Sequence, residues 1–409
     1  MAPNLLGGLA MTQPIVPHRI PGADELVARA RAMVPALRQR AAATEAARRV
    51  SKEAGQQFLE AGFFRVLQPK RFGGYETPFG THMRIAAELG RGCASSAWVA
   101  SVVAVHSWIV GMFPLEAQEE VWGNDHDALV ATSFLPAGVR VERVGNGIVL
   151  TGRWKFSSGL DLCRWAIPLI DLPPREPGGK SELGLALLPL SDCKTEDTWY
   201  TSGLAGTGSN DFTCESLFVP EHRVIAVSAL KGGETPGSAA NPSPFNRLPL
   251  WTFFPFALIG AGLGAAKGAL ELVADGLANR KSIAQVKIAE QQSVQLRIAR
   301  ATAQINAAEA LLLQDLQAVN RDAAAGVIPE IEQRLRYRLN LSYAIELCVN
   351  AVDTLYPLLG GRGLIATDPV QRAWRDVHAV SQHIALVWDV TGGLYGAVRL
   401  GFPCADPKI

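Results

Sequence analysis

Two short segments combine glycine with hydroxyl side chains in a way that suits ligand binding. They are Gly152–Gly159, which contains Ser157 and Ser158, and Gly203–Asp211, which contains Thr207 and Ser209. Small residues let backbone N–H groups approach a ligand and donate hydrogen bonds to its phosphate or carbonyl oxygens. Neither segment matches the GxxxxGK(S/T) phosphate loop, which argues against that kind of nucleotide site. Taken singly, each segment is more often an ordinary turn than a binding site.

Histidine is the side chain best suited to moving protons near neutral pH, and three histidines lie in helical patterns. His378 and His383 are five residues apart, so on one helix their side chains would diverge by about 140° and could not share a metal ion. One of them should face a site and the other the bundle or a subunit contact. His106 lies in Ala94–Met112, a nearly all-apolar stretch that predicts a buried helix. A lone histidine there is more often a core residue with satisfied nitrogens.

The elements around these residues form three zones after a Pro/Gly-rich stretch at residues 1–22, which we interpret as a flexible leader with Met11 as an alternative start. Residues 23–125 show helical spacing, residues 126–235 short β-branched runs between turns, and residues 236–409 long helices. The predicted strands are Ala128–Ser133, Val139–Val144, Ile148–Thr151, Leu183–Pro189 and Ser216–Val219, which suggest a small antiparallel barrel or sandwich. The predicted long helices, enough for a four-helix bundle, are Trp251–Leu277, Ile283–Ala323, Ile328–Leu358 and Pro369–Tyr395.

Composition narrows the class of protein. A chain of 409 residues suits two or three domains, and its low content of charged residues, 19%, indicates that much of the surface is buried against sister subunits. The net charge of +1 argues against nucleic acid or an anionic membrane as a partner. Six scattered cysteines without a CxxC pair fit a reducing compartment better than a disulfide framework or a zinc site, so we expect a cytoplasmic protein.

The order of a helical domain, a small β-domain and a four-helix bundle, with WxxSSG at Trp154–Gly159 and GTGSxD at Gly206–Asp211, resembles the acyl-CoA dehydrogenase superfamily. More narrowly, it resembles the oxygenase branch, which includes the oxygenase component of p-hydroxyphenylacetate hydroxylase, the seco-steroid hydroxylase and the dibenzothiophene monooxygenase. The resemblance covers nearly the whole chain after residue 22, including the late segment Gly360–Asp376. It implies an α+β fold that is mainly α.

The resemblance also implies an activity, that of the oxygenase component of a two-component flavin-dependent monooxygenase. Such an enzyme takes reduced FMN, or FAD, from a separate NAD(P)H-dependent flavin reductase. It hydroxylates an aromatic substrate with O2 through a flavin C4a-hydroperoxide, in a site that must exclude water. The chain has no dinucleotide fingerprint of its own, so a partner must supply the hydride chemistry. We expect a homotetramer with no bound metal.

Site residues follow from the same resemblance. Those expected at the flavin are Trp154, Ser157 and Ser158 beside the ring, Gly206, Thr207 and Ser209 at the ribityl phosphate, Ser133 as a further contact, and Arg280 reaching phosphate across a subunit interface. Those expected at the substrate are His383 as the base, His106 orienting the substrate, and Trp251 and Phe254 as walls of the cavity. His383 is preferred to His378 because it lies nine residues after Trp374. For Ser133, Arg280 and the aromatic run Trp251–Phe256, an ordinary packing or surface role is the alternative.

A dehydrogenase of this superfamily would need a carboxylate to remove the α-proton of its substrate. At the position after the GGxG turn this chain has Thr367, and at the alternative position in the first bundle helix it has Phe254. Asp368 is one residue from the first position, so an acyl-CoA dehydrogenase with a displaced base is a rival hypothesis. Another rival is a monooxygenase of the same branch that oxidises sulfur or nitrogen. A third is a DNA-binding relative, against which the near-neutral charge counts.

Overall fold

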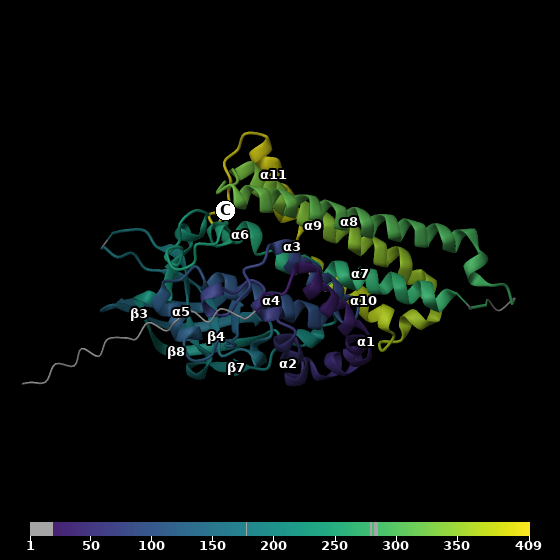
Figure 1. Ribbon diagram of the computed structural model, residues 1–409, viewed down its shortest axis with the longest axis horizontal. Helices are drawn as coiled ribbons and strands as arrows, with labels where there is room; N and C mark the ends of the chain where they lie inside the picture. The colour runs from purple at the N-terminus through teal and green to yellow at the C-terminus, as the bar shows by residue number, and fades with distance from the viewer. Residues whose placement is uncertain (1–18, 177, 279, 282–284) are drawn as a thin grey trace, which may run out of the picture.

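Helices, strands and then long helices follow one another along the chain in its computed structural model (Figure 1). The structure describes residues 19–176, 178–278, 280–281 and 285–409, so most of the predicted leader, with Met11, lies outside the described residues. The predicted class, α+β and mainly α, is confirmed, as is the order of a helical domain, a small β-domain and a helical bundle.

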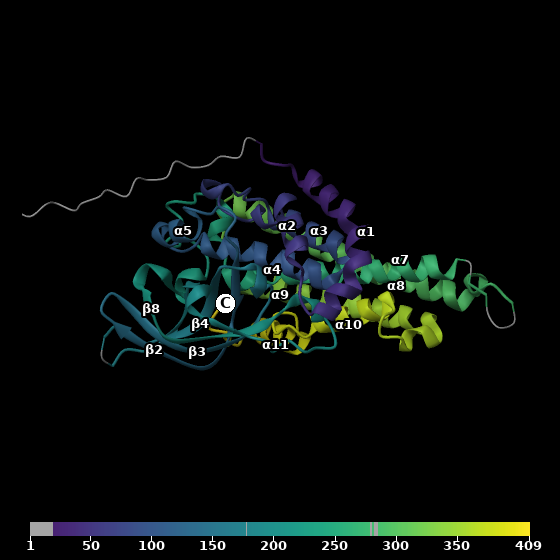
Figure 2. The same ribbon diagram turned by 90° about the horizontal axis from the view of Figure 1, so that it is seen from below.

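The first region is built around one apolar helix. Its helices are α1 (Ala23–Ala47), α2 (Lys52–Glu60), α3 (Phe79–Gly90), α4 (Ala94–Val110) and α5 (Leu115–Trp122). Every residue of α4 is buried, as predicted for this stretch. The helix contacts α3, the bundle helix α7 (Phe256–Leu277) and the strand β1 (Val130–Ser133), so it lies between the β-domain and the bundle (Figure 2). Side chains of α4 can therefore reach both.

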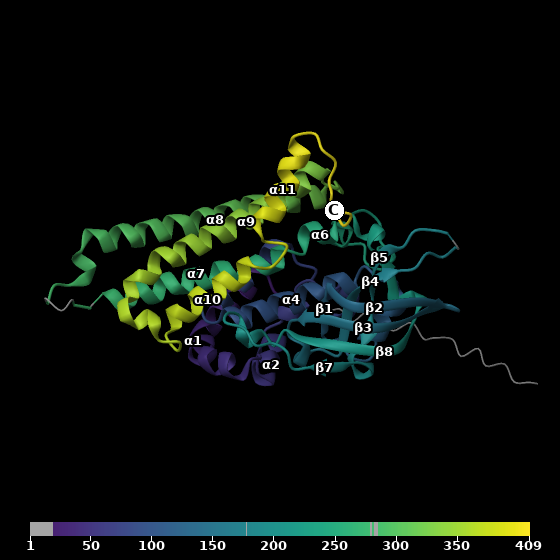
Figure 3. The same ribbon diagram turned by 180° about the vertical axis from the view of Figure 1, so that it is seen from behind.

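The second region contains two small sheets. Besides β1, their strands are β2 (Leu135–Val144), β3 (Gly147–Ser157), β4 (Trp165–Leu172), β5 (Glu182–Ala186), β6 (Leu188–Pro189), β7 (Lys194–Glu196), β8 (Asn210–Pro220) and β9 (Val224–Ala226). One sheet has the order β1–β4–β5–β9, with β6 on β4, and the other has the order β2–β3–β8–β7 (Figure 3). β1 and β4 are parallel, and the other named pairs are antiparallel. Residues of both sheets share one apolar core.

Three features of the β-domain differ from the predictions. The domain is mixed and not purely antiparallel, because β1 pairs with β4 in parallel. The strand β4 was not predicted, because its residues are mostly apolar and buried without the alternation of a half-buried strand, and because it contains Pro168. Cys193 and Cys214 form a disulfide, so the prediction of reduced cysteines is wrong for this pair. The antiparallel register of β7 on β8, with Lys194 opposite Thr213, brings these two cysteines together across 21 residues of sequence.

The third region is the bundle. Besides α7, its helices are α6 (Leu250–Phe253), α8 (Gln292–Ala324), α9 (Ile331–Leu355), α10 (Pro369–Ser381) and α11 (Trp388–Arg399). The prediction of one helix over Pro369–Tyr395 is wrong, because the chain leaves the helix between α10 and α11. Ala385 and Leu386 in this connection are buried in the main core, so packing, rather than a local sequence signal, ends α10.

The other bundle helices depart less from the predicted ranges. Pro255, which has no N–H to donate, separates α6 from α7. The predicted start of the second helix, Ile283, lies outside the described residues, and α8 begins at Gln292. The segment Leu250–Leu277 is long and apolar enough to cross a membrane, but 78% of its most apolar window is buried inside the fold. We therefore interpret it as a core helix.

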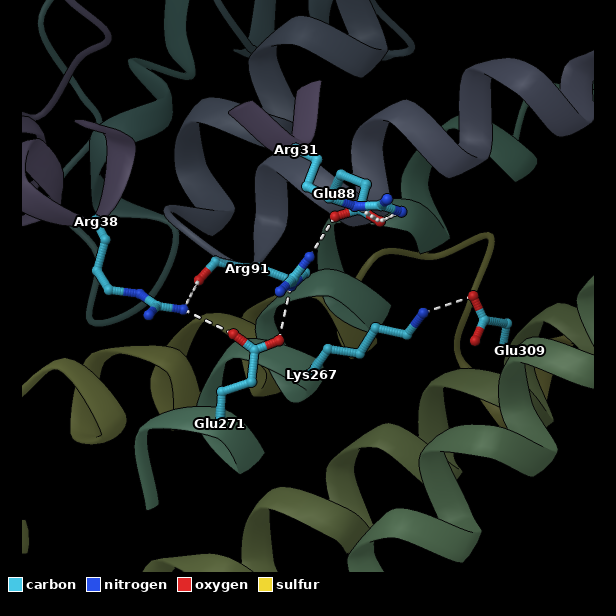
Figure 4. Close-up of polar contacts among 7 residues, drawn as sticks. All are labelled: Arg31, Arg38, Glu88, Arg91, Lys267, Glu271 and Glu309. Atoms are coloured by element: carbon cyan, nitrogen blue, oxygen red, sulfur yellow. Dashed lines mark hydrogen bonds and ion pairs between the residues drawn. The ribbon is translucent and has the colours of Figure 1, made fainter. Parts of the chain in front are cut away.

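Charged side chains tie the first region to the bundle (Figure 4). Glu271 on α7 accepts hydrogen bonds from Arg38 on α1 at 3.0 Å and from Arg91, just after α3, at 2.7 Å. Glu88 pairs with both Arg91 and Arg31. These pairs are partly exposed, so solvent screens them and each stabilises the fold only weakly. Their main effect is to fix the orientation of α1 and α3 on α7.

Candidate active site

Trp98 on α4 connects two of the segments in which chemistry is predicted. Its indole Nε1 donates a hydrogen bond to Ser158 Oγ, just after β3, at 3.0 Å. Its ring centroid lies 5.9 Å from that of His383, in the connection between α10 and α11. The structure therefore brings His383 and the Ser157–Ser158 turn to one place. Trp98 was not singled out from the sequence, because it looks like any other apolar residue of a buried helix.

The prediction placed His383 on a helix, but it lies two residues beyond the end of α10. Its Nδ1 accepts a hydrogen bond from the backbone N–H of Ala385 at 3.2 Å. A neutral ring in this arrangement carries its proton on Nε2 and presents a donor to a ligand. Burial, reinforced by the positive charge of Arg338, lowers the pKa of His383 to about 4, so the ring is neutral at pH 7. In this position His383 is suited to stabilising an anionic oxygen, and acting as a base would require it to release Ala385.

His378 is held on the outer side of α10. Its Nδ1 contacts the Trp374 carbonyl at 2.8 Å, its ring lies 4.3 Å from the Trp374 ring, and its Nε2 lies 3.4 Å from a carboxylate oxygen of Asp353 on α9. These contacts place His378 at the surface between α9 and α10. The arrangement favours His383 as the site histidine.

His106 on α4 is buried against the strand β1. Its Nδ1 contacts the Val130 carbonyl at 2.7 Å, and its Nε2 contacts the Thr132 hydroxyl at 2.8 Å. Burial lowers the pKa of His106 to about 3. Both nitrogens are thus satisfied by the protein, which is the core arrangement that the sequence left open. A direct contact with a substrate would require Thr132 to turn away.

Three of the predicted flavin contacts lie at the ends of neighbouring strands. Ser133, the last residue of β1, donates a hydrogen bond to the Lys155 carbonyl at 2.5 Å. Ser157, the last residue of β3, is completely buried, and its hydroxyl has no hydrogen-bond partner. Ser158 contacts Ser209 Oγ at 2.7 Å in addition to Trp98. A buried hydroxyl without a partner is unfavourable, and a hydrogen bond to a bound group would satisfy it.

Phe156, between these serines and Lys155, is a residue that the sequence did not single out. It adopts a positive φ of 63°, and its residue surface is 57% exposed although it is a large apolar side chain. Its ring packs edge-on against Trp199 at 5.6 Å. An exposed apolar ring can pack against a flat ring such as that of a flavin, and the Ser157 hydroxyl could donate to a polar edge. The residues present are therefore compatible with a flavin site.

Trp154 does not reach this surface. Its side chain is fully buried in the β-domain core, stacked on Phe212 at 5.3 Å, and its Nε1 donates to the Leu169 carbonyl at 2.8 Å. A contact with a bound flavin would require this core to open. The alternation along β3, in which Ile148, Leu150 and Trp154 all face inward, could have indicated this from the sequence.

The Gly203–Ser209 turn is packed inside the protein. A Cβ added at Gly206 would lie 2.6 Å from the methyl group of Thr44 on α1 and 3.1 Å from Ser95 on α4. The Thr207 hydroxyl donates to the Leu204 carbonyl at 2.9 Å and contacts Ser209 Oγ at 2.7 Å. These hydroxyl groups therefore already have protein partners.

Asp376 on α10 explains why this turn is held so firmly. Its carboxylate accepts a hydrogen bond from the Leu204 N–H at 2.6 Å, and the neighbouring Arg372 and Arg375 pair with Glu45 on α1. Burial raises the pKa of Asp376 to about 7. The late Arg–Arg–Asp segment thus clamps the turn between α1 and α10.

Aromatic rings gather beside the end of β1. Phe134 lies 4.6 Å from the ring of Trp251 and 5.3 Å from that of Phe254, and Phe254 stacks on His106 at 6.2 Å. The Trp251 carbonyl accepts a hydrogen bond from Arg338 on α9 at 3.0 Å. The predicted substrate residues Trp251, Phe254 and His106 are therefore neighbours in one apolar cluster.

Arg280 lies elsewhere, at the end of the bundle. Its Nη1 donates to the Leu358 carbonyl at 2.9 Å, next to Gly360. Within one chain this arginine is separate from His383 and the serines. A contact with flavin phosphate would have to be made to another subunit, as the prediction states.

Similarity to known proteins gives the family. Residues 23–124 match the family model of the acyl-CoA dehydrogenase N-terminal domain, and residues 257–388 match that of the C-terminal domain. The oxygenase component of the FADH(2)-dependent resorcinol hydroxylase from Rhizobium sp. strain MTP-10005 is 36% identical over 394 residues, which are 94% of this chain and 95% of that protein. This chain belongs to the acyl-CoA dehydrogenase family, among its flavin-dependent oxygenase components.

Solved structures agree with this place in the acyl-CoA dehydrogenase family. The 3-HSA hydroxylase from Rhodococcus sp. RHA1 superposes with a TM-score of 0.90 at 32% identity, over 95% of this chain and all of that chain. XiaF from Streptomyces sp., solved in complex with FADH2 and glycerol, superposes with a TM-score of 0.86 at 26% identity, over 95% of this chain and 98% of that chain.

The oxygenase assignment also agrees with the geometry of Asp368. This carboxylate accepts hydrogen bonds from the N–H groups of Val370 and Gln371 at the start of α10, and it pairs with Arg362 at 2.9 Å. It is a helix cap, a role that the Asp–Pro pair at positions 368 and 369 could have indicated. The rival hypothesis of a dehydrogenase that uses Asp368 as a displaced base is therefore abandoned.

Proposed function

We propose that this chain takes reduced FMN, with FAD as the alternative, from a separate NAD(P)H-dependent flavin reductase and uses it with O2 to hydroxylate a phenolic or polycyclic aromatic substrate. One observation carries the proposal: Trp98 joins the neutral His383 to the Ser157–Ser158 turn, where a buried hydroxyl lacks a partner. The flavin would supply the activation of oxygen, and the protein the binding, orientation and exclusion of water.

The residues of the chain would share these tasks. Ser157 and Ser158 would donate hydrogen bonds to the polar edge of the flavin, and Phe156 would pack on its ring. His383 would donate from Nε2 to the oxygen of the substrate and so favour its ionised form. Phe134, Trp251 and Phe254 would form an apolar wall against a flat ring and keep water out.

The choice of substrate class rests on two supports. Two relatives are named as the oxygenase components of hydroxylases that act on aromatic compounds, resorcinol and p-hydroxyphenylacetate. The cluster of Phe134, Trp251 and Phe254 suits an aromatic ring more than an aliphatic thioester. Which atom of the ring is hydroxylated would depend on the pose of the substrate.

We further propose a cytoplasmic homotetramer. Large apolar side chains stay exposed on and around α11 in the single chain: Ile384, Trp388, Leu400 and Phe402. Tyr343 on α9, also exposed, lies 6.0 Å from the Trp388 ring. Large apolar side chains left exposed along one helix and its flanks are typical of a contact between subunits.

The first experiment is stopped-flow absorbance after the protein with reduced FMN is mixed with oxygenated buffer. The proposal expects a long-lived absorbing species that precedes oxidised flavin, with a shorter lifetime in Ser157→Ala. Ser191→Ala, which changes an exposed serine elsewhere in the β-domain, should behave as the wild type. Reoxidation at the rate of free flavin in the wild type would contradict the proposal.

A further inference from the structure

Arg338 on α9 is a buried cation that forms no ion pair with a carboxylate among the described residues. The residue is 6% exposed, its Nη1 donates to the Trp251 carbonyl, and its Nε is buried with no hydrogen-bond partner. Among the residues that the structure describes, no carboxylate lies within 4 Å of its guanidinium. Asp406, in the C-terminal segment, acts on it only from a distance and is itself paired with Lys408 at 2.8 Å.

Such an arrangement costs free energy. A charge removed from water is normally paired with an opposite charge or fully hydrogen-bonded, because its desolvation is otherwise strongly unfavourable. The other arginines of α9 have more partners. Arg334 donates to the carbonyls of Pro329 and Lys231, and Arg336, whose side chain is 42% exposed and whose Nε also lacks a hydrogen-bond partner, lies 3.8 Å from Asp315. Arg338 differs from both because it is 6% exposed and has neither a second carbonyl acceptor nor a carboxylate within 4 Å among the described residues.

Arg338 lies next to the aromatic cluster predicted to bind the substrate. Arg338 holds the backbone of Trp251, the residue whose ring packs on Phe134 in the apolar cluster. The indole Nε1 of Trp251 is likewise a buried donor without a partner. His383 presents a third donor, its Nε2–H, because its Nδ1 is occupied by Ala385. Arg338 lies close enough to His383 for its charge to act on that ring, and donors of this kind are suited to a ligand that carries an anionic oxygen.

We propose that Arg338 is the counter-charge for the aromatic substrate, so that the site selects a ring bearing an anionic oxygen, a phenolate or a ring carboxylate. This inference rests on the proposed function for the identity of the ligand. Arg338 is then a specificity residue that contacts the substrate, and Trp251 links it to the aromatic wall. Neutral aromatic rings of the same size would bind through the wall alone.

The test is a binding measurement that needs no turnover. The probes are 4-nitrophenol, whose ionised form absorbs visible light, 4-nitrobenzoate, and the neutral ether 4-nitroanisole, each titrated into the purified protein while tryptophan fluorescence is followed. The wild type should bind ionised 4-nitrophenol or 4-nitrobenzoate more tightly than 4-nitroanisole and should lower the apparent pKa of bound 4-nitrophenol. Whichever anion binds more tightly identifies the source of the charge. Equal affinity for all three probes in the wild type would overturn the proposal without any variant.

Variants sharpen the result. Arg338→Met should weaken the anionic probes roughly 10- to 100-fold and leave 4-nitroanisole unchanged, and Arg338→Lys should restore part of the loss. Arg334→Met, on the same helix but bonded only to backbone carbonyls, is the matched control and should match the wild type. An equal loss for all probes would show a merely structural role, and a loss confined to binding of reduced FMN would assign the charge to the flavin. Either outcome overturns the proposal.

The two proposals fail separately. If the stopped-flow species forms in the wild type but the probes do not discriminate by charge, the proposed function stands and the role of Arg338 is wrong. If the probes discriminate but no such species forms, the site recognises anionic aromatic rings and the oxygenase proposal fails.

Discussion

At the scale of single residues, hydrogen-bond partners decide which side chains of the site can bind a ligand. Ser157 Oγ and Trp251 Nε1 have no partner in the protein, whereas the two histidines differ. His106 has both nitrogens occupied, whereas His383 has one nitrogen available for a ligand. Two histidines that both looked able to move a proton therefore differ in what they can do. Hydrogen-bond partners, which depend on the fold, make the difference.

The first prediction concerns His383. His383→Ala should lower turnover of a phenolic substrate by about 100-fold or more, because a positioned donor at the reacting oxygen is lost. His378→Ala removes only contacts at the outer surface of α10 and should leave turnover near that of the wild type. Both variants are compared by product formation with a common reductase. A larger loss in His378→Ala than in His383→Ala would reverse the assignment.

The pH dependence belongs to the same residue. Because the pKa of His383 is lowered to about 4, its ring stays neutral from pH 5 upward. An ordinary exposed histidine becomes protonated around pH 6.5, and turnover that depends on its neutral form falls below that pH. We expect no such fall from His383. A pH–rate profile of the wild type between pH 5 and 8 checks this, and an acid limb near pH 6.5 that disappears in His383→Gln would contradict it.

At the scale of elements, α10 holds two other parts of the chain in place. Its Asp376 holds the Gly203–Ser209 turn, and its Arg372 and Arg375 hold α1 through Glu45. The turn in turn fixes Ser158 through Ser209. A chain of hydrogen bonds and packing contacts therefore connects α10 with Ser158, which is predicted to lie at the flavin ring.

The clamp gives a stability prediction. The pKa of Asp376 is raised from an unfolded value near 4 to about 7, so between these values the folded state holds a proton that the unfolded state has lost. Stability from this group is present at low pH and is lost as pH rises through 7. Asp376→Asn keeps an acceptor for the Leu204 N–H but cannot titrate. The fall in unfolding free energy from pH 5 to pH 8 should therefore be smaller in this variant, by on the order of 1–3 kcal/mol.

Urea unfolding at the two pH values measures this difference. Asp353→Asn, which changes a carboxylate at the exposed surface of α9, serves as the control and should keep the pH dependence of the wild type. Identical pH dependence in Asp376→Asn and the wild type would mean that another group is responsible. Glu45, whose pKa is lowered by its two arginines against the effect of burial, loses its contribution only at lower pH.

At the scale of the whole molecule, the exposed apolar residues around α11 predict assembly. Trp388→Glu should shift the protein from the proposed tetramer toward smaller species, because a charge would be buried in the contact. Val144→Glu, at an exposed position of the β-domain, should leave the assembly unchanged. Sedimentation velocity distinguishes these outcomes, and an unchanged size in Trp388→Glu would place the contact elsewhere.

The sequence by itself determined the order of the three regions, the buried helix α4, and the absence of an acidic residue at both dehydrogenase positions. These features depend on residue types and on local periodicity, which can be determined without knowing which distant residues are in contact. Tertiary structure decided the rest. Packing of Ala385 and Leu386 ends α10 before His383, and the β-domain core encloses Trp154 away from the predicted flavin face. The contact of α6 with α9 buries Arg338 with no carboxylate in direct contact among the described residues. Each outcome depends on residues far apart in sequence that become neighbours only when the chain folds.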